Sequence, residues 1–387
     1  MPIERVAIIG AGMAGLTAAL SFARHGIACD IFEEADALVE VGAGLQVSPN
    51  ASRVLSTLGV LGRLEALWTE PERIALVSGM SLRPLAHVPA GRFARERWRA
   101  PYGVLHRATL QKALLSAVEQ DPLCTLHLDT PVREDAQGSL ARITGKTYPL
   151  IVGADGVWSS LRASIPHSPK PDFSRNVAWR FTIDQSAAPS WLAANQVTAF
   201  LGPSTHVVAY PLKEIGGFNI VAIASGISPG ETWDAEASEA QRAMLLSQFH
   251  RWDRRIADLL AKAERPTFWP LYEVSTGRWH NGRDRVLIGD AAHAMMPFAA
   301  QGASMAIEDA FMLANRVAGS LPLAQALSAF ESERTGRIAR VRARGLFNRF
   351  AYHARGPLRF GRDIVLSLRP PQSLAADLDW LYGFRPE

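Results

Sequence analysis

The chain has 387 residues, and 48 % of them are hydrophobic. A chain of this length exceeds the usual size of one hydrophobic core, so we expect two interlocked domains. Its two cysteines, Cys29 and Cys124, are too few for a disulfide framework and indicate a reducing, cytoplasmic location. The formal net charge is only +4, and the basic residues concentrate in segment 331–369, so we expect no nucleic-acid partner.

The first long apolar segment, residues 6–23, contains no charged residue and is long enough to resemble a membrane span. Gly10, Gly12 and Gly15 divide it into a short strand, a turn and a helix rich in small residues. We therefore expect no membrane partner.

In chain order, the pattern predicts a strand at 5–9, a helix at 14–25 that ends at Gly26, and a strand at 27–33. This is a βαβ unit. Two later strands, at 150–154 and 285–288, each run into Gly and Asp, which places two loops at the carboxyl ends of strands. In α/β sheets, ligands bind at such ends.

Between these strands the alternation of apolar and polar residues predicts a sheet-based second domain, with strands at 177–183, 197–201, 206–212 and 218–224. An amphipathic helix is expected at 241–262 and another at 302–317. The predicted fold class is α/β, or α+β overall, with a Rossmann-like first domain, a β-sheet second domain and C-terminal helices.

The strongest local motif is Gly10-Ala-Gly12-Met-Ala14-Gly15, which follows the first strand and opens the first helix. Gly10 permits the tight turn, Gly12 lets the backbone approach a pyrophosphate, and Gly15 allows close packing of helix and strand. Glu33, 18 residues after Gly15, ends the next strand and is placed to accept hydrogen bonds from a ribose. The motif predicts a dinucleotide but does not separate NAD from FAD.

Two further motifs, GADGVWSSLR at 153–162 and GDAAHAMMPFAAQGASMAIEDA at 289–310, resemble the signatures of flavin-dependent aromatic hydroxylases. The segments GAGLQVSPN at 42–50 and 93–107 resemble the branch that contains salicylate hydroxylase and 6-hydroxynicotinate 3-monooxygenase. The resemblance implies an FAD-binding domain made of 1–75, 100–172 and 271–345. It also implies a substrate domain made of 76–99 and 173–270, and a C-terminal helical segment at 346–387.

By resemblance, FAD is bound tightly but not covalently, and NADH or NADPH is the co-substrate. Asp290 would bond a ribityl hydroxyl, Arg107 would reach the pyrophosphate, backbone near Val132 would touch adenine, and Asp155 with Gly156 would serve both cofactors. Gln46, Gly302 and Ala303 complete the expected cofactor-binding set. Independently of the family, Pro297 and the small residues at 302–304 predict a helix N-terminus, whose partial positive charge would stabilise an anionic reduced flavin by roughly 0.3 to 2 kcal/mol.

His206 and Tyr210, four residues apart, lie on one face of a predicted strand and resemble the residues that contact the hydroxyl group of phenolic substrates. A His of near-neutral pKa suits the removal of a phenolic proton. Core packing is the alternative for both. Gln301 is a further catalytic candidate and Arg180 a weaker one, whereas His293 is interpreted as loop structure.

The reaction implied is hydroxylation of a small phenolic or hydroxypyridine carboxylic acid by O2 through a flavin C4a-hydroperoxide, catalysed by a monomer or homodimer without a metal. Gln46 stands where the hydroxynicotinate hydroxylases carry His, which keeps benzoates and other phenols open. Alternatives are an epoxidase or hydroxylase of a larger non-acid substrate, and a non-oxygenating NADH oxidase or redox sensor.

We expect two groups of arginines to lie on a solvated surface. The alternative for Arg92, Arg95, Arg97 and Arg99 is recruitment of a carboxylate. The alternative for the arginines of 331–369 is attraction of nicotinamide phosphates, while a subunit contact is also compatible with a solvated surface.

Overall fold

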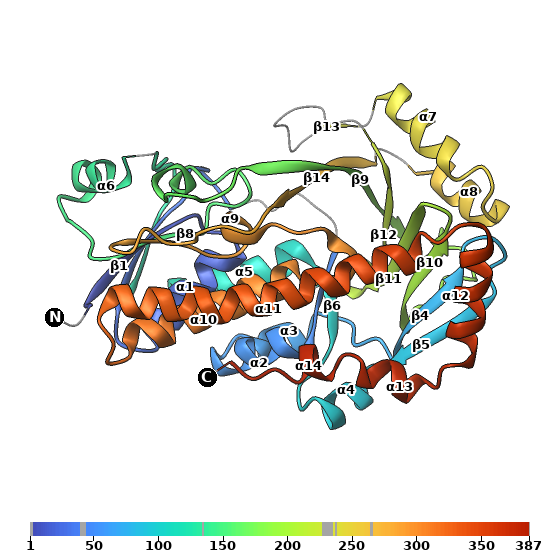
Figure 1. The fold of residues 1–387 in the computed structure, drawn as a ribbon, viewed down its shortest axis with the longest axis horizontal. Helices are drawn as coiled ribbons and strands as arrows, with labels where there is room; N and C mark the ends of the chain where they lie inside the picture. The colour runs from blue at the N-terminus through green and yellow to red at the C-terminus, as the bar shows by residue number, and fades with distance from the viewer. Residues whose placement is uncertain are drawn as a thin grey trace.

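The fold consists of a parallel sheet and a larger mixed sheet that lie side by side, with one long helix running past both (Figure 1). The computed structural model describes residues 3–38, 44–133, 135–226, 235–236, 238–263 and 266–386. The predicted motif residues Gly42 and Ala43 therefore lie outside the described residues. Within the described residues, no helix is both long enough and apolar enough to span a bilayer.

The first sheet is parallel throughout, with strand order β15-β8-β1-β2-β7. Its strands are β1 (Arg5–Ile9), β2 (Ala28–Phe32), β7 (Cys124–His127), β8 (Ile151–Gly153) and β15 (Arg285–Leu287). Helix α1 (Met13–Ala23) is buried along its whole length and packs against α5 (Arg107–Glu119) and α10 (Gly302–Ala318). The carboxyl ends of β1, β8 and β15 meet at one edge, as the sequence predicts.

The second sheet has eight strands in the order β13-β14-β9-β12-β11-β10-β4-β5. All neighbours are antiparallel except β10 and β4. The strands are β4 (Arg73–Ser78), β5 (Pro84–Pro89), β9 (Pro171–Asp184), β10 (Gln196–Gly202), β11 (Thr205–Leu212), β12 (Gly217–Ser225), β13 (Ala235–Glu236) and β14 (Thr267–Val274). The predicted strands at 177–183, 197–201, 206–212 and 218–224 are confirmed.

The remaining elements connect the sheets or cover them. A small antiparallel pair joins β3 (Gly44–Val47) and β6 (Gly103–His106). The other helices are α2 (Pro49–Thr57), α3 (Leu61–Glu65), α4 (Arg92–Arg97), α6 (Ala136–Thr144), α7 (Glu239–Gln248), α8 (Arg254–Ala261), α9 (Asp290–His293), α11 (Leu323–Tyr352), α12 (Gly356–Leu368), α13 (Pro371–Ala376) and α14 (Asp379–Tyr382). Short 3-10 helices occupy Leu161–Ser164, Lys213–Ile215 and Pro297–Ala299.

The prediction of a single helix at 241–262 is wrong, because this segment forms two helices, α7 and α8, with a break between them. Phe249 and Trp252 are buried at the break and pack into the core of the second sheet. Asp253 then starts the second helix, since its side chain accepts a hydrogen bond from the backbone N–H of Arg255. The hydrophobic period alone does not reveal such a break.

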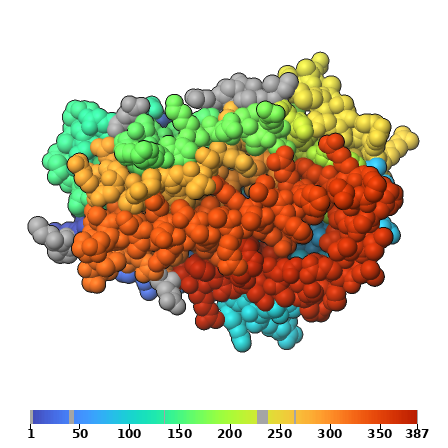
Figure 2. Space-filling model, viewed as in Figure 1, coloured from blue at the N-terminus to red at the C-terminus, as the bar shows by residue number. Residues whose placement is uncertain are grey.

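Helix α11 is 30 residues long and extends from the first sheet toward the second (Figure 1). Figure 2 shows the C-terminal residues, in red, covering one end of this face of the molecule. Strand β4 belongs to the second sheet and begins at Arg73, a little before the predicted boundary at residue 76. The division into domains at the stated residues stays a prediction.

Candidate active site

The glycine turn between β1 and α1 is shaped by the close approach of three backbone segments. Gly10 has a φ of +98°, and a Cβ there would lie 2.6 Å from the carbonyl oxygen of Ala154. A Cβ on Gly15 would lie 1.9 Å from the carbonyl oxygen of Gly10. By contrast, a Cβ on Gly12 would meet no atom within 4 Å, so this glycine faces open space. Two of the glycines allow packing and the third leaves room for a ligand.

The predicted cofactor residues near this turn already hold backbone groups. The carboxylate of Glu33 accepts hydrogen bonds from the N–H groups of Ala11, at 2.7 Å, and Ala35, at 3.1 Å. Asp155 is partly buried, and its removal from water raises its pKa; it accepts a hydrogen bond from the N–H of Ser160 at 2.8 Å. The carbonyl of Val132 accepts a hydrogen bond from the hydroxyl of the same serine. These residues fix the shape of the turn region.

A cavity of about 300 Å³ lies where the glycine turn, the N-terminus of α10 and strand β11 converge. Most of the predicted site residues line it: Gly12, Ala14, Gln46, Arg107, Gly156, His206, Tyr210, Asp290, Gln301, Gly302 and Ala303. Gly10, Gly15, Glu33, Val132 and Asp155 are not among its lining residues. Arg180, the weaker candidate, also lines it. Predicted cofactor residues from the first sheet and predicted substrate residues from the second sheet therefore line the same cavity.

Two helix N-termini open into this cavity. Neither α1, which starts after Gly12, nor α10, which starts after Gln301, has a side-chain cap, so their first N–H groups are left for other partners. A Cβ on Gly302 would meet no atom within 4 Å. Two positive helix ends with open space before them suit a ligand that carries a pyrophosphate and a flat ring with negative charge.

His206 and Tyr210 of β11 face this cavity from the second sheet. Both are almost fully buried, with 2 % and 3 % of their surface exposed. Burial, together with the neighbouring imidazole of His353, lowers the pKa of His206 well below its usual value, and burial raises the pKa of Tyr210. At neutral pH His206 is therefore a neutral ring with one free nitrogen and a weaker base than the near-neutral histidine expected from the sequence, while the phenol of Tyr210 keeps its proton.

A chain of hydrogen bonds links the cavity wall to the helices behind it. The phenol of Tyr102 donates to the side-chain oxygen of Gln46. The side-chain amide of Gln301 donates to the hydroxyl of Ser48 at 3.0 Å, and Asn50 donates to the oxygen of Gln301 at 3.3 Å. Gln46 and Gln301 are thus held in place before any ligand binds.

A second cavity of about 550 Å³ adjoins the first and shares Gln46, His206, Val208, Pro297 and Ala300 with it. Its lining is mainly apolar and comes from the second sheet on one side and from α11, α12 and α13 on the other. The C-terminal helices therefore cover a space that is continuous with the predicted active site.

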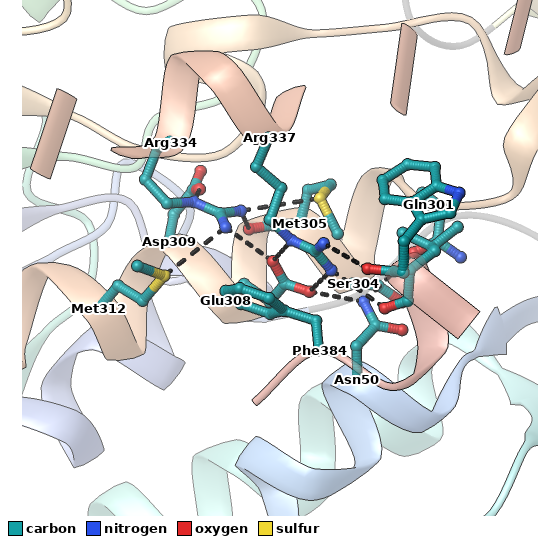
Figure 3. Close-up of polar contacts among 12 residues, drawn as sticks. Asn50, Gln301, Ser304, Met305, Glu308, Asp309, Met312, Arg334, Arg337 and Phe384 are labelled. Atoms are coloured by element: carbon teal, nitrogen blue, oxygen red, sulfur yellow. Dashed lines mark hydrogen bonds and ion pairs between the residues drawn. The ribbon is translucent and has the colours of Figure 1, made fainter. Parts of the chain in front are cut away.

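A buried ion cluster anchors α10 to α11 (Figure 3). Arg334 is completely buried and bonds Glu308 and Asp309, each at 2.7 Å. Arg337 binds both carboxylate oxygens of Glu308 at 2.6 Å. Burial opposes the charge on Asp309, but His293 and Arg334 hold its pKa at about 2.

The cluster reaches the cavity at two points. Asp309 accepts a hydrogen bond from the N–H of Gly289, which positions the loop that leads to Asp290. Glu308 accepts a hydrogen bond from Asn50 at 2.7 Å, and Asn50 in turn bonds Gln301. The cluster therefore sets the position of both the Asp290 loop and the first turn of α10.

The structure corrects one interpretation of the arginines. Arg334 and Arg337 are buried in ion pairs, so the solvated interpretation of segment 331–369 is wrong for these two. Around α4, Arg92, Arg95 and Arg97 form exposed ion pairs with Glu96, Glu70 and Asp379, and none of the three lines either cavity. That region fits the solvated interpretation and not the recruitment of a carboxylate.

Comparison with known proteins identifies the family. The family described as FAD binding domain matches residues 4–344. The chain is 34 % identical to 3-amino-4-hydroxybenzoate 2-monooxygenase from Streptomyces platensis, over 98 % of this chain and 96 % of the relative. This chain belongs to the family of FAD-dependent aromatic hydroxylases.

Two further matches agree with this family. The chain is 32 % identical to 3-hydroxybenzoate 6-hydroxylase 1 from Aquipseudomonas alcaligenes, with 98 % of both chains covered. Its fold is similar to that of Klebsiella pneumoniae HpxO in complex with FAD and uric acid, with a TM-score of 0.79 and 23 % identity over 98 % of this chain and 96 % of that one. The predicted family, fold class and flavin cofactor are confirmed.

The first cavity fits FAD on the observations above. The open space at Gly12 and the N-terminus of α1 suit its pyrophosphate, and the open space at Gly302 suits a flat ring at the N-terminus of α10. Asp290 and Arg107 line the same cavity and supply a hydrogen-bond acceptor and a cation.

Replacement of Gly302 by Leu should raise the dissociation constant of FAD about 10-fold or more, because the side chain fills the space in front of α10 and overpacking costs about 1–3 kcal/mol. Gly336→Leu is the matched control, since Gly336 is an exposed helical glycine with open space around it. Fluorescence titration of the apoproteins with FAD measures the effect. Equal affinity in the two variants would show that α10 does not face the cofactor.

Removal of the buried cation in Arg334→Met should lower the free energy of unfolding by about 3–5 kcal/mol, because Glu308 and Asp309 lose their partner in the interior. Arg316→Met, which removes a partly exposed pair with Glu333, should cost less than about 1 kcal/mol. Urea unfolding measures both.

The pH dependence of this stability has a definite sign. The pKa of Asp309 is lowered from 3.8 to about 2 in the folded state, so its stabilisation is complete above about pH 4 and is lost as the pH falls toward 2. In the urea experiment above, unfolding of Arg334→Met at the same urea concentration as the wild type would show that the ion cluster does not stabilise the fold.

Proposed function

We propose that this flavin monooxygenase hydroxylates a small phenolic carboxylic acid, using O2 and NADH or NADPH. The observation that carries the proposal is that His206 and Tyr210 enter, from the second sheet, the same cavity that the FAD motifs line from the first. The two relatives above, which act on an aminohydroxybenzoate and a hydroxybenzoate, support the same substrate class.

When bound, FAD would supply the redox chemistry that links the reduced nicotinamide to O2. The remaining tasks fall to the side chains of this chain. Neutral His206 accepts the proton of the substrate hydroxyl, and the phenolate that results is richer in electrons and more easily attacked by an electrophilic oxygen. Tyr210 keeps its proton and donates a hydrogen bond that orients the substrate oxygen.

Gln301 and Gln46 complete the wall around the ring. Both line the first cavity, and each is held by a neighbour, Gln301 by Ser48 and Gln46 by Tyr102. A preorganised polar wall orients a ligand without losing side-chain freedom on binding. The apolar remainder of the second cavity disfavours water beside the reacting centre.

We assign the substrate carboxylate to Arg344 of α11. Among the described residues that line the second cavity, Arg362 pairs with Asp363 and Arg369 pairs with Asp377. The Nε of Arg344, in contrast, is buried and has no hydrogen-bond partner among the described residues. A carboxylate in this apolar space would satisfy a guanidinium with a charge-assisted hydrogen bond. Arg180, which lines the first cavity and stacks on Trp269 at 5.3 Å, is the other arginine to test as a carboxylate partner.

The function is tested by supplying isotopically labelled O2 and reduced nicotinamide with a panel of hydroxybenzoates, aminohydroxybenzoates and hydroxypyridine carboxylates. We expect one labelled oxygen atom in the product of at least one acid, with one nicotinamide consumed per product. Consumption of nicotinamide without label in any product would instead indicate a non-oxygenating NADH oxidase or redox sensor.

Replacement of Arg344 by Gln should weaken binding of the aromatic acid about 10-fold or more, since a hydrogen bond to a charged group contributes about 1.5–3 kcal/mol. Binding of the matching carboxamide should change much less. Arg340→Gln is the control, because Arg340 lies on the same helix over Trp380 and lines neither cavity. Equal loss for acid and carboxamide, or loss only in Arg180→Gln, would contradict the assignment to Arg344.

The size of the second cavity favours one other function. About 550 Å³ of mainly apolar space is more than a hydroxybenzoate fills, which suits hydroxylation or epoxidation of a larger non-acid ring system. The same panel, extended to neutral polycyclic phenols, separates the two, because this alternative requires faster turnover of the neutral compounds.

We also propose a cytoplasmic location. Cys29 and Cys124 are both free, although they are direct partners across β2 and β7, and a reduced pair suits a reducing compartment. The expectation of a monomer or homodimer stays a prediction.

A further inference from the structure

His206 is joined to a second histidine, His353, which belongs to none of the sequence motifs. Its Nδ1 lies 2.9 Å from Nε2 of His353, the residue directly after α11. The two rings are also packed together, with centroids 5.1 Å apart, and both contact Phe298. Since the hydrogen bond uses Nδ1 of His206, the nitrogen left for a ligand in the adjoining cavities is Nε2.

The two histidines lie between the active-site cavities and a hollow on the surface. His206 lines both cavities and is 2 % exposed. His353 lines neither of them, is only partly buried, and instead lines an open hollow of about 480 Å³ with Ser204, Arg349 and Arg355. Its Nε2 is used by the bond to His206, so Nδ1 is the nitrogen left for water in that hollow. The pair therefore connects the two active-site cavities to a hollow that is more open to solvent.

We propose that His353 is the second member of a proton path that carries the substrate's hydroxyl proton from His206 to solvent; this proposal rests on the hydroxylase function proposed above. The substrate O–H bond breaks as Nε2 of His206 takes its proton. At the same time the Nδ1–H proton of His206 passes to Nε2 of His353, and the Nδ1–H proton of His353 passes to water. No charge is left on either ring. After hydroxylation, the same transfers in reverse bring a proton from water through His353 and His206 to the phenolate oxygen of the product, which restores both rings.

The surroundings of the pair favour a path in which neither ring holds a proton for long. Burial and the charges of Arg349 and Arg355 lower the pKa of His353 to about 4. Tyr352 and Phe298, the other ring neighbours of His206, carry no charge at neutral pH, since burial raises the pKa of the tyrosine. Both imidazoles are therefore neutral near pH 7, the state in which each accepts a proton on one nitrogen and releases one from the other.

A purely structural role is the competing explanation, because the same hydrogen bond ties the end of α11 to β11. The variant His353→Gln separates the two roles. The side-chain oxygen of Gln accepts the hydrogen bond from Nδ1 of His206 and preserves the tie, but an amide does not accept one proton while releasing another. His250→Gln is the control, since His250 is exposed and lines none of the three cavities.

With a phenolic acid that the wild type hydroxylates, we expect His353→Gln to bind the acid within about 3-fold of the wild-type affinity. We expect its hydroxylation rate to fall about 100-fold, as for the loss of a proton-transfer group. Ultraviolet absorbance measures the formation of bound phenolate without any turnover, and we expect this step to slow to the same degree. Small bases such as imidazole should restore the rate in His353→Gly, because the hollow beside residue 353 is open.

The pH profile gives a second readout that a structural tie would not move. Arg355→Glu removes one of the charges that lower the pKa of His353, so the acid limb of the hydroxylation rate should move to higher pH. Arg359→Glu makes the same charge change one helical turn further along α12 and should leave the limb in place.

The outcomes distinguish this proposal from the proposed function. Wild-type rates of phenolate formation and hydroxylation in His353→Gln would overturn the proton path while leaving the hydroxylase function intact. A fall in rate that only follows a loss of substrate affinity would also overturn it. Failure of the wild type to hydroxylate any phenolic acid would overturn the proposed function itself.

Discussion

The buried ion cluster of Glu308, Asp309, Arg334 and Arg337 is the constraint on which the site depends. Ions in a protein interior are costly unless they are paired and their hydrogen bonds are satisfied, and here two carboxylates face two guanidinium groups. Through Gly289 and Asn50 the cluster fixes the Asp290 loop and the start of α10. The positive end of that helix is therefore held rigidly toward the cavity, which is the condition for electrostatic stabilisation without reorganisation.

The active site is a meeting of two surfaces that serve different purposes. The parallel sheet contributes the glycine turn, Asp290 and the α10 terminus, which suit a dinucleotide and a flat ring. The mixed sheet contributes His206 and Tyr210, which suit a phenol. Helix α11 runs past both sheets and contributes Arg344 to the second cavity, and His353, directly after this helix, lines the outer hollow. The cofactor side follows the family motifs, whereas much of the substrate side comes from the C-terminal helices.

This division explains what the sequence predicted and what it did not. The glycine turn and the strand ends at 153–156 and 289–290 could be predicted, because the backbone geometry at these places requires particular residues in the local sequence. The broken helix at 249–253, the buried Arg334 and the pairing of His206 with His353 were not, because each depends on contacts between residues distant in the chain. The sequence did not distinguish Arg344 from the other arginines of its segment, because the ion pairs of Arg362 and Arg369, the other arginines of the second cavity, are visible only in the structure.

The most direct test of the account is a crystal structure of the FAD-loaded protein with a hydroxybenzoate bound. We predict the flavin ring in front of Gly302 at the start of α10, and the aromatic acid between it and β11. The substrate hydroxyl should lie within hydrogen-bond distance of Nε2 of His206, and its carboxylate should lie against Arg344. An aromatic ring bound elsewhere, or one whose carboxylate faces His206, would contradict the central claim that the two cavities form one oriented hydroxylation site.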